Sequence, residues 1–439
     1  MAEVLNLDVG HPDLRGHATR IVRYAMATIG PVAAAATQFV LSLQLLHLLT
    51  PASFGSFSFL LVLSQFGTGL WSALFCAPLP IVMAQDEKSG QHLVSSLFAV
   101  NLALSVLAFG AFLVLGLGLK VPAAAAALFA GYAAVALLRW VARAHAYAVG
   151  AAHRTVASDL VYSGGLLIGI GLIAFLGTGT PDLPYGALLI SAAVSLLPFG
   201  RQYFLTQFVR IQLRHLARYA HIWRQHSSWS LFGVITTEAT VNAHAYIVTL
   251  ISGPLGFAPI AASALIIRPI NVVSNALTEF ERPQMARQIA RGDSGSVPRS
   301  TGTFLLVLVL TWAVTVAAAV LLMAYGPEVI FPGHYPRATL ALGMALWLAV
   351  TFVRILRTPD SVLLQAAGMF RWLAHASIVS SVVSIAAVTM LLLLGGPLWS
   401  LGGVLLGEAM FAAWTRYQAR RWRATARAIP SLTSSETRT

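Results

Sequence analysis

Long apolar segments, separated by short polar connections, run through most of the chain. Reading between charged residues and breaks marked by Gly or Pro gives twelve segments, each close to the roughly 20 residues that a helix needs to cross about 30 Å of hydrocarbon. The predicted spans are 22–48, 56–83, 93–118, 123–148, 158–177, 184–205, 228–251, 257–279, 302–324, 338–366, 372–394 and 398–416. The pattern therefore predicts an all-α membrane protein with about 12 transmembrane helices.

The longest polar connection follows the sixth span and divides the spans into two sets of six. It contains apolar Val209, Leu213 and Leu216 three or four residues apart, with Arg210 and Arg214 on another face. An amphipathic helix on the anionic inner leaflet would explain both periods. The same basic face could bind nucleic acid, but basic interfacial helices are common in membrane proteins, so we expect no nucleic-acid partner. The predicted units are a cytoplasmic segment 1–20, a first lobe 21–205, a connector 206–226, a second lobe 227–419 and a cytoplasmic tail 420–439.

The two sets of spans show a weak internal repeat. An offset of 203 residues aligns TPASFGSF at 50–57 with GPLGFAPI at 253–260, and PIVMAQ at 80–85 with PQMARQ at 283–288. The second span is thereby aligned with the eighth. We therefore expect two pseudo-symmetric six-helix lobes, repeated in the same orientation.

Composition and charge support a membrane location and set the orientation. The 439 residues are 57% hydrophobic and only 10% charged, against roughly 25% charged in a soluble domain. The net charge of +13 is distributed unevenly, because Lys120 and Arg337 are the basic residues assigned to connections on the second side, whereas most of the others lie on the first. Since basic loops are retained in the cytoplasm, we expect both termini to be cytoplasmic.

Sequence signatures of enzymes are missing. The chain contains no GxxxxGK[ST], HExxH or GxSxG pattern, and its histidines do not pair with carboxylates at metal-ligand spacing. The single cysteine, Cys76, excludes an intramolecular disulfide framework. We therefore expect no enzymatic activity, no catalytic residue, no metal and no cofactor.

Five arginines fall inside predicted spans, where an unpaired charge is costly and tends to face a cavity or a partner. They are Arg139 and Arg143 in the fourth span, Arg268 in the eighth, and Arg354 and Arg357 in the tenth. A cavity with surplus guanidinium groups favours a phosphate or an acidic sugar, so we predict that these residues bind substrate. The alternative is that they reach the lipid headgroups, above all Arg143 and Arg357 near the ends of their spans.

The seventh span is the most polar of the twelve. Glu238, Asn242 and Tyr246 follow one another four residues apart and form one stripe. We predict that Asn242 binds substrate and that Glu238 couples transport to H⁺ or Na⁺, since an intramembrane carboxyl group can bind either ion. The alternatives for Glu238 are a permanent arginine partner or a protonated structural residue.

Two further polar residues lie in the first and the last of the twelve spans. Gln38, in the first span, suits a sugar hydroxyl, although hydrogen bonding between helices is the commoner use of such an amide. We predict that it binds substrate. Glu408, beside glycines in the last span, is expected to serve helix packing.

Four segments give the chain a resemblance to a known family. They are LLTPASFGSFSF after the first span, its counterpart ISGPLGFAPIAASALIIRP, and the late segments QAAGMFRW and GGPLWSLGGVLLGEA. Over about residues 20–420 the chain resembles the polysaccharide transporter (oligosaccharide flippase) family of the multidrug/oligosaccharidyl-lipid/polysaccharide (MOP) exporter superfamily.

The resemblance implies a MATE-like fold and alternating access between two lobes. It also implies a multi-pass protein of the bacterial inner membrane that translocates an oligosaccharide or exopolysaccharide repeat unit linked to undecaprenyl diphosphate. Membrane lipids, a polysaccharide polymerase and the export machinery would be its partners. A cation-coupled multidrug exporter is the first alternative, and a membrane-embedded polysaccharide polymerase or transferase the second.

Overall fold

A computed structural model describes residues 14–83, 87–176, 182–209, 217–291, 297–326, 328, 331–333 and 335–428. This part of the chain contains helices and turns and no strand, which confirms the all-α prediction. Ten helical segments in it are long and apolar enough to cross a membrane. Two differences explain why ten segments stand against twelve predicted spans. The seventh and eighth predicted spans share one segment, Ala243–Ile289, and the twelfth predicted span is not among the ten.

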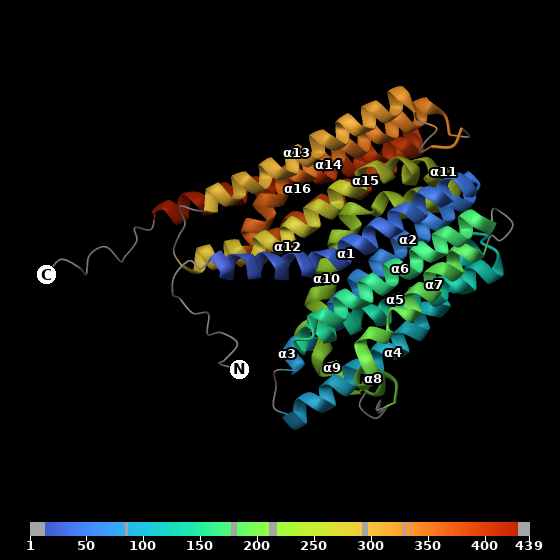
Figure 1. Ribbon diagram of the computed structural model, residues 1–439. Coiled ribbons are helices and arrows are strands. Elements are labelled where there is room, and N and C mark those ends of the chain that lie inside the picture. Colours follow the sequence, from blue (N-terminus) through green and yellow to red (C-terminus); the bar gives the residue numbers. More distant parts are fainter. Residues whose placement is uncertain are drawn as a thin grey trace.

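Two helical bundles form the molecule (Figure 1). The N-lobe contains α1 (Leu14–Leu48), α2 (Pro51–Trp71), η1 (Ser72–Cys76), α3 (Leu79–Met83), α4 (Glu87–Gly118), α5 (Ala123–Ala148), α6 (Ala152–Leu176), α7 (Leu183–Val194), η3 (Leu197–Phe199), α8 (Gly200–Phe204) and η4 (Leu205–Val209). The C-lobe contains α10 (Ser228–Val241), α11 (Ala243–Ala264), η7 (Leu265–Ile267), α12 (Arg268–Ala290), α13 (Val297–Tyr325), α14 (Arg337–Ala366), α15 (Phe370–Gly395), η9 (Pro397–Trp399) and α16 (Ser400–Ala428).

The lobes converge at the end where α2 packs against α11 and diverge toward the end that carries α3 and the last turns of α16 (Figure 1). Gly55 of α2 makes the convergence possible. A Cβ atom added to Gly55 would lie 2.0 Å from the carbonyl oxygen of Pro254 in α11, so only a glycine lets the two backbones approach this closely. We call this contact the closed end.

Buried apolar side chains join the lobes at the closed end. One core cluster combines Leu45 of α1 and Phe57 of α2 with Ala258 and Ala262 of α11 and Met344 of α14. The cores nearer the diverging end are formed mainly within one lobe. Tight contact is therefore concentrated at one end of the V, as alternating access would require of a closed side.

The seventh predicted span is not one straight helix. Asn242 has φ −118° and ψ 6°, which ends α10, and Gly253 has φ 71° and ψ 178°, which divides α11 directly before Pro254. Proline supplies no N–H to the preceding turn, and glycine tolerates the positive φ. The span predicted at 228–251 therefore consists of α10 and the first part of α11.

The connector packs in part against the N-lobe. Arg210, Leu213, Arg214 and Leu216 lie outside the described residues. The part that follows, α9 (Tyr219–Ile222) and η6 (Trp223–Ser227), lies on η1: the Tyr219 hydroxyl donates to the Leu74 carbonyl oxygen over 2.9 Å. At the carboxyl terminus of the C-lobe, α16 continues to Ala428 and includes the beginning of the predicted tail.

Candidate functional site

The two arginines of α5 bind one buried carboxylate in the N-lobe. Arg139 and Arg143 both form ion pairs with Oδ1 of Asp159 on α6, whose side chain is fully buried. Nε of Arg139 also donates to the Ser158 hydroxyl over 3.0 Å. The arginine side chains are 11% and 12% exposed, so this cluster lies in the interior of the lobe.

Gln38 of α1 closes the same cluster from another helix. Its amide nitrogen donates to the hydroxyl groups of Tyr132 on α5, over 3.2 Å, and Tyr162 on α6, over 3.0 Å. The Arg139 guanidinium lies 4.8 Å from the centre of the Tyr162 ring, within range of a cation–π contact. Gln38 thus makes the interhelical hydrogen bonds that were the alternative to its predicted role in binding substrate.

The C-lobe contains a cluster of the same composition. Nε of Arg354 and Nε of Arg357, both on α14, lie 3.0 Å and 2.7 Å from the two carboxylate oxygens of Glu408 on α16. The Glu408 side chain is fully buried, and the guanidinium of Arg357 lies 4.2 Å from the centre of the Phe411 ring. Nη2 of Arg354 is buried and has no hydrogen-bond partner among the described residues.

The arginines of the two clusters occupy equivalent positions in the lobes, but their carboxylates do not, because α6 follows α5 directly whereas α15 lies between α14 and α16. The helices that carry the arginines begin after Pro122 and Pro336, and the chain leaves them near glycines of positive φ, Gly150 and Gly368. Arg143 and Arg357 each follow the proline by 21 residues. The internal repeat therefore extends to the arginines, although helix lengths have changed its offset from 203 residues.

Arg268 differs from the other four arginines. It begins α12, the helix that lies beside α1 of the N-lobe at the diverging end (Figure 1). Within the described part of the chain, no carboxylate lies within ion-pair distance of it. In the described part of the chain, the ion pairs of the other four arginines are with Asp159 and Glu408.

The polar stripe of the seventh span forms one hydrogen-bonded group, which we call the Glu238 group. Oε1 of Glu238 accepts from the Asn242 amide over 3.0 Å and from the Tyr246 hydroxyl. The Tyr246 ring lies 6.1 Å from that of Phe59 and 6.3 Å from that of Phe66, both on α2 of the other lobe. In the described part of the chain, Glu238 is therefore held by an amide and a phenol, not by an arginine, and its group contacts the interface between lobes.

Sequence reasoning missed Asp159 and assigned Glu408 to packing. A signal for Asp159 was present, since α5 and α6 form a hairpin around Gly150. Asp159 follows Gly150 by nine residues, between the seven and eleven by which Arg143 and Arg139 precede it. Residues equally far from a tight antiparallel turn lie opposite each other. The distances from Gly150 along the sequence therefore predict that Asp159 contacts both arginines.

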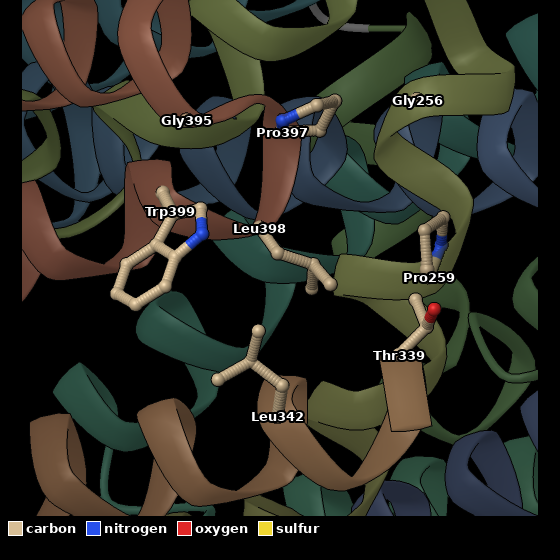
Figure 2. A pocket seen from close by; sticks show the side chains of 8 residues that line it. All are labelled: Gly256, Pro259, Thr339, Leu342, Gly395, Pro397, Leu398 and Trp399. Atoms are coloured by element: carbon tan, nitrogen blue, oxygen red, sulfur yellow. The ribbon is translucent and has the colours of Figure 1, made fainter. Parts of the chain in front are cut away.

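A small apolar pocket lies apart from these charged groups. It has a volume of about 240 Å³ and lies between α11, α14 and the turn at η9. Figure 2 shows Leu342, Leu398 and Trp399 around it, with Pro259 and Thr339 at one side. None of the predicted site residues lines it, so the arrangement of charged groups, and not this pocket, defines the candidate site.

Comparisons with known proteins identify the fold. The chain matches no protein-family model and shows no significant similarity to a curated protein sequence. It is similar to a multidrug resistance MATE transporter of the MOP superfamily in an inward-facing conformation, with a TM-score of 0.67 and 13% identity over 91% of this chain and 96% of that one. The outward-facing conformation of such a transporter gives a TM-score of 0.59 and 15% identity over 92% and 95%.

A third similar structure is a MOP superfamily transporter from Pyrococcus furiosus, described as having a binding pocket of reverse polarity that suggests a different function. It has a TM-score of 0.58 and 14% identity over 92% of this chain and 95% of that one. At these identities the similarity concerns architecture. The helical bundles, their V-shaped arrangement and the near-complete coverage give this chain the two-lobe fold of the MATE transporters of the MOP superfamily.

Proposed function

We propose that this protein is a membrane transporter that flips a polyprenyl-diphosphate-linked oligosaccharide or exopolysaccharide repeat unit across the bacterial inner membrane by alternating access. The observation that carries the proposal is the surplus of guanidinium groups: among the described residues, Arg354 and Arg357 share the one carboxylate of Glu408, and Arg268 has no carboxylate within ion-pair distance. Arginine matches the geometry of phosphate oxygens. A diphosphate headgroup would supply the negative charge that these helices lack.

Within this proposal, Arg268 is the first contact for the diphosphate. Among the described residues it has no carboxylate to release, and its helix contacts α1 of the other lobe. The C-lobe cluster, with two arginines on one carboxylate, carries a positive charge that would attract the headgroup. Movement requires two lobe arrangements that contact the headgroup differently, not a chemical step.

A deletion strain tests the function. Loss of the protein should leave undecaprenyl-linked repeat units on the cytoplasmic face, and a plasmid carrying the unaltered gene should restore export of the polysaccharide. In the same assay Arg268→Gln should reduce export tenfold or more at normal protein level, because a hydrogen bond to a charged group is worth about 1.5–3 kcal/mol. Arg337→Gln is the matched control, since Arg337 is an exposed arginine at the start of α14 that is paired with Glu328.

Other outcomes of this assay favour other functions. Normal polysaccharide together with drug hypersensitivity would support a multidrug exporter, the second candidate, which the MATE transporters with the same fold favour. Single repeat units already exported would support a polymerase. Unaltered export by Arg268→Gln would remove this residue from the binding site.

Within the same proposal, Glu238 links transport to an ion gradient. Its carboxylate contacts Tyr246, whose ring lies against α2 of the other lobe, so binding of a cation at Glu238 would change a contact between lobes. Glu238→Gln keeps the hydrogen bond from Asn242 but cannot exchange a proton or bind Na⁺ as a carboxylate does. In proteoliposomes we expect this variant to lose any dependence of transport on pH or Na⁺. A variant with the dependence of the unaltered protein would assign coupling to another residue.

A further inference from the structure

A second pocket, which is charged, lies away from the proposed substrate site, at the basic end of the C-lobe. Its volume is about 250 Å³, and it lies between the beginning of α13, the second half of α14 and the end of α16. Arg416, Arg420 and Arg423 of α16 line one side of it, and Asp360 of α14 another. None of these residues belongs to the arginine clusters or to the Glu238 group.

The pocket retains positive charge after its internal ion pair is counted. Asp360 binds Nη2 of Arg423 at 2.5 Å, which leaves Arg416 and Arg420, one helical turn apart, without a carboxylate from the pocket lining. Nε of Arg423 is buried and donates to no described residue. The amino-terminal turn of α13 also lines the pocket, and the partial positive charge at a helix start favours an anion.

An apolar surface leads away from the pocket along α13. Gly302 lies at the pocket, and Leu306, Leu310 and Val314 follow it at intervals of four residues, with exposed fractions of 57%, 56% and 69%. Residues at this spacing lie on one face of a helix. A ligand that binds the arginines could therefore extend an apolar chain along the outside of α13.

We propose that this pocket binds the phosphate headgroup of an anionic membrane phospholipid, with its acyl chains along the exposed face of α13. Basic pockets between transmembrane helices suit such headgroups. The apolar face of α13 beside the pocket favours a lipid over a soluble phosphate, because a soluble phosphate would contact only the arginines. The site is separate from the proposed transport function and would serve as a fixed lipid contact of the C-lobe.

The test is native mass spectrometry of the purified full-length protein, titrated with phosphatidylglycerol or phosphatidylcholine. The unaltered protein should retain one phosphatidylglycerol in preference to phosphatidylcholine. Removing both of these charges with Arg416→Gln and Arg420→Gln should weaken this binding about thirtyfold, as expected for the loss of two basic residues near an anionic lipid. Arg421→Gln, an exposed arginine on the same helix that does not line the pocket, should bind as the unaltered protein does.

A second variant fills the pocket without changing its charge. A Cβ atom added to Gly302 would meet no atom within 4 Å, so Gly302→Trp can be accommodated by the open space, and Gly302→Ala is the control for the loss of glycine. We expect the tryptophan variant to lose the bound phosphatidylglycerol and the alanine variant to retain it, with both eluting as folded protein in size-exclusion chromatography.

Three results would overturn the proposal. They are equal retention of phosphatidylcholine, an equal loss of binding in Arg421→Gln, and full displacement of phosphatidylglycerol by millimolar inorganic phosphate, which would identify a soluble phosphate as the ligand. A defect in polysaccharide export with normal lipid retention would concern the transport function alone, so the two proposals fail separately.

Discussion

Asp159→Asn is expected to lower the free energy of unfolding by about 3–5 kcal/mol, the usual cost of removing one partner from a buried ion pair. Asp159 is fully buried and binds both Arg139 and Arg143. Without its charge, two guanidinium groups would face each other in the interior of the N-lobe. Thermal denaturation of the detergent-purified protein measures the effect as a lower Tm.

The control for this variant is Glu328→Gln, because Glu328 pairs with Arg337 where both side chains are more than half exposed. Exposed pairs contribute little to stability, so its Tm should match that of the unaltered protein. The double variant Asp159→Asn with Arg143→Gln should recover part of the lost stability, since removing one arginine relieves the repulsion. An Asp159→Asn protein with unchanged Tm would show that the arginines do not depend on this carboxylate.

Gly55→Ala is expected to separate the lobes at the closed end. The added methyl group would lie 2.0 Å from the carbonyl oxygen of Pro254, and a backbone atom cannot rotate away. Overpacking of this kind costs about 1–3 kcal/mol, enough to change the ratio of two conformations by about tenfold. Spin labels at Ala52→Cys and Leu250→Cys, both exposed and on different lobes, would report a longer distance in a Cys76→Ser background.

A second tight glycine provides the matched control. A Cβ atom at Gly403 of α16 would lie 2.2 Å from the backbone nitrogen of Val388 in α15, within the C-lobe. Gly403→Ala should therefore lower the Tm without changing the distance between the labels. If Gly55→Ala gave the label distance of the unaltered protein, the contact of α2 with α11 would not hold the lobes together.

Much of the fold could be predicted because few backbone conformations can cross a membrane. Apolar length predicted the helices, the asymmetry of basic residues supported their number, and the alignment of Pro51 with Pro254 predicted that α2 and the part of α11 from Pro254 onward are counterparts. Their direct contact could not be predicted, because it depends on the absence of a side chain at Gly55. Nor could the break at Asn242, since the stripe of Glu238 and Tyr246 continues across it as it would in one helix.

The charged residues were harder to interpret than the helices. Arg139 and Arg354 were recognised because they interrupt apolar runs, whereas Asp159 lies next to the predicted start of its span at residue 158 and therefore looks like a residue of the boundary. The structure begins α6 at Ala152, so Asp159 lies two turns inside the helix. Glu408 lies among glycines, which suggests close packing but does not show which helix packs there.

The break at Asn242 has a mechanical consequence. Beyond it α11 is fixed against α2 by the backbone contact at Gly55, whereas α10 lies between α15 and η1 of opposite lobes. A continuous helix would transmit any tilt of α10 to the fixed segment. Because the helix is interrupted at Asn242, α10 can tilt while α11 stays in contact with α2. Glu238 lies one helical turn from this interruption.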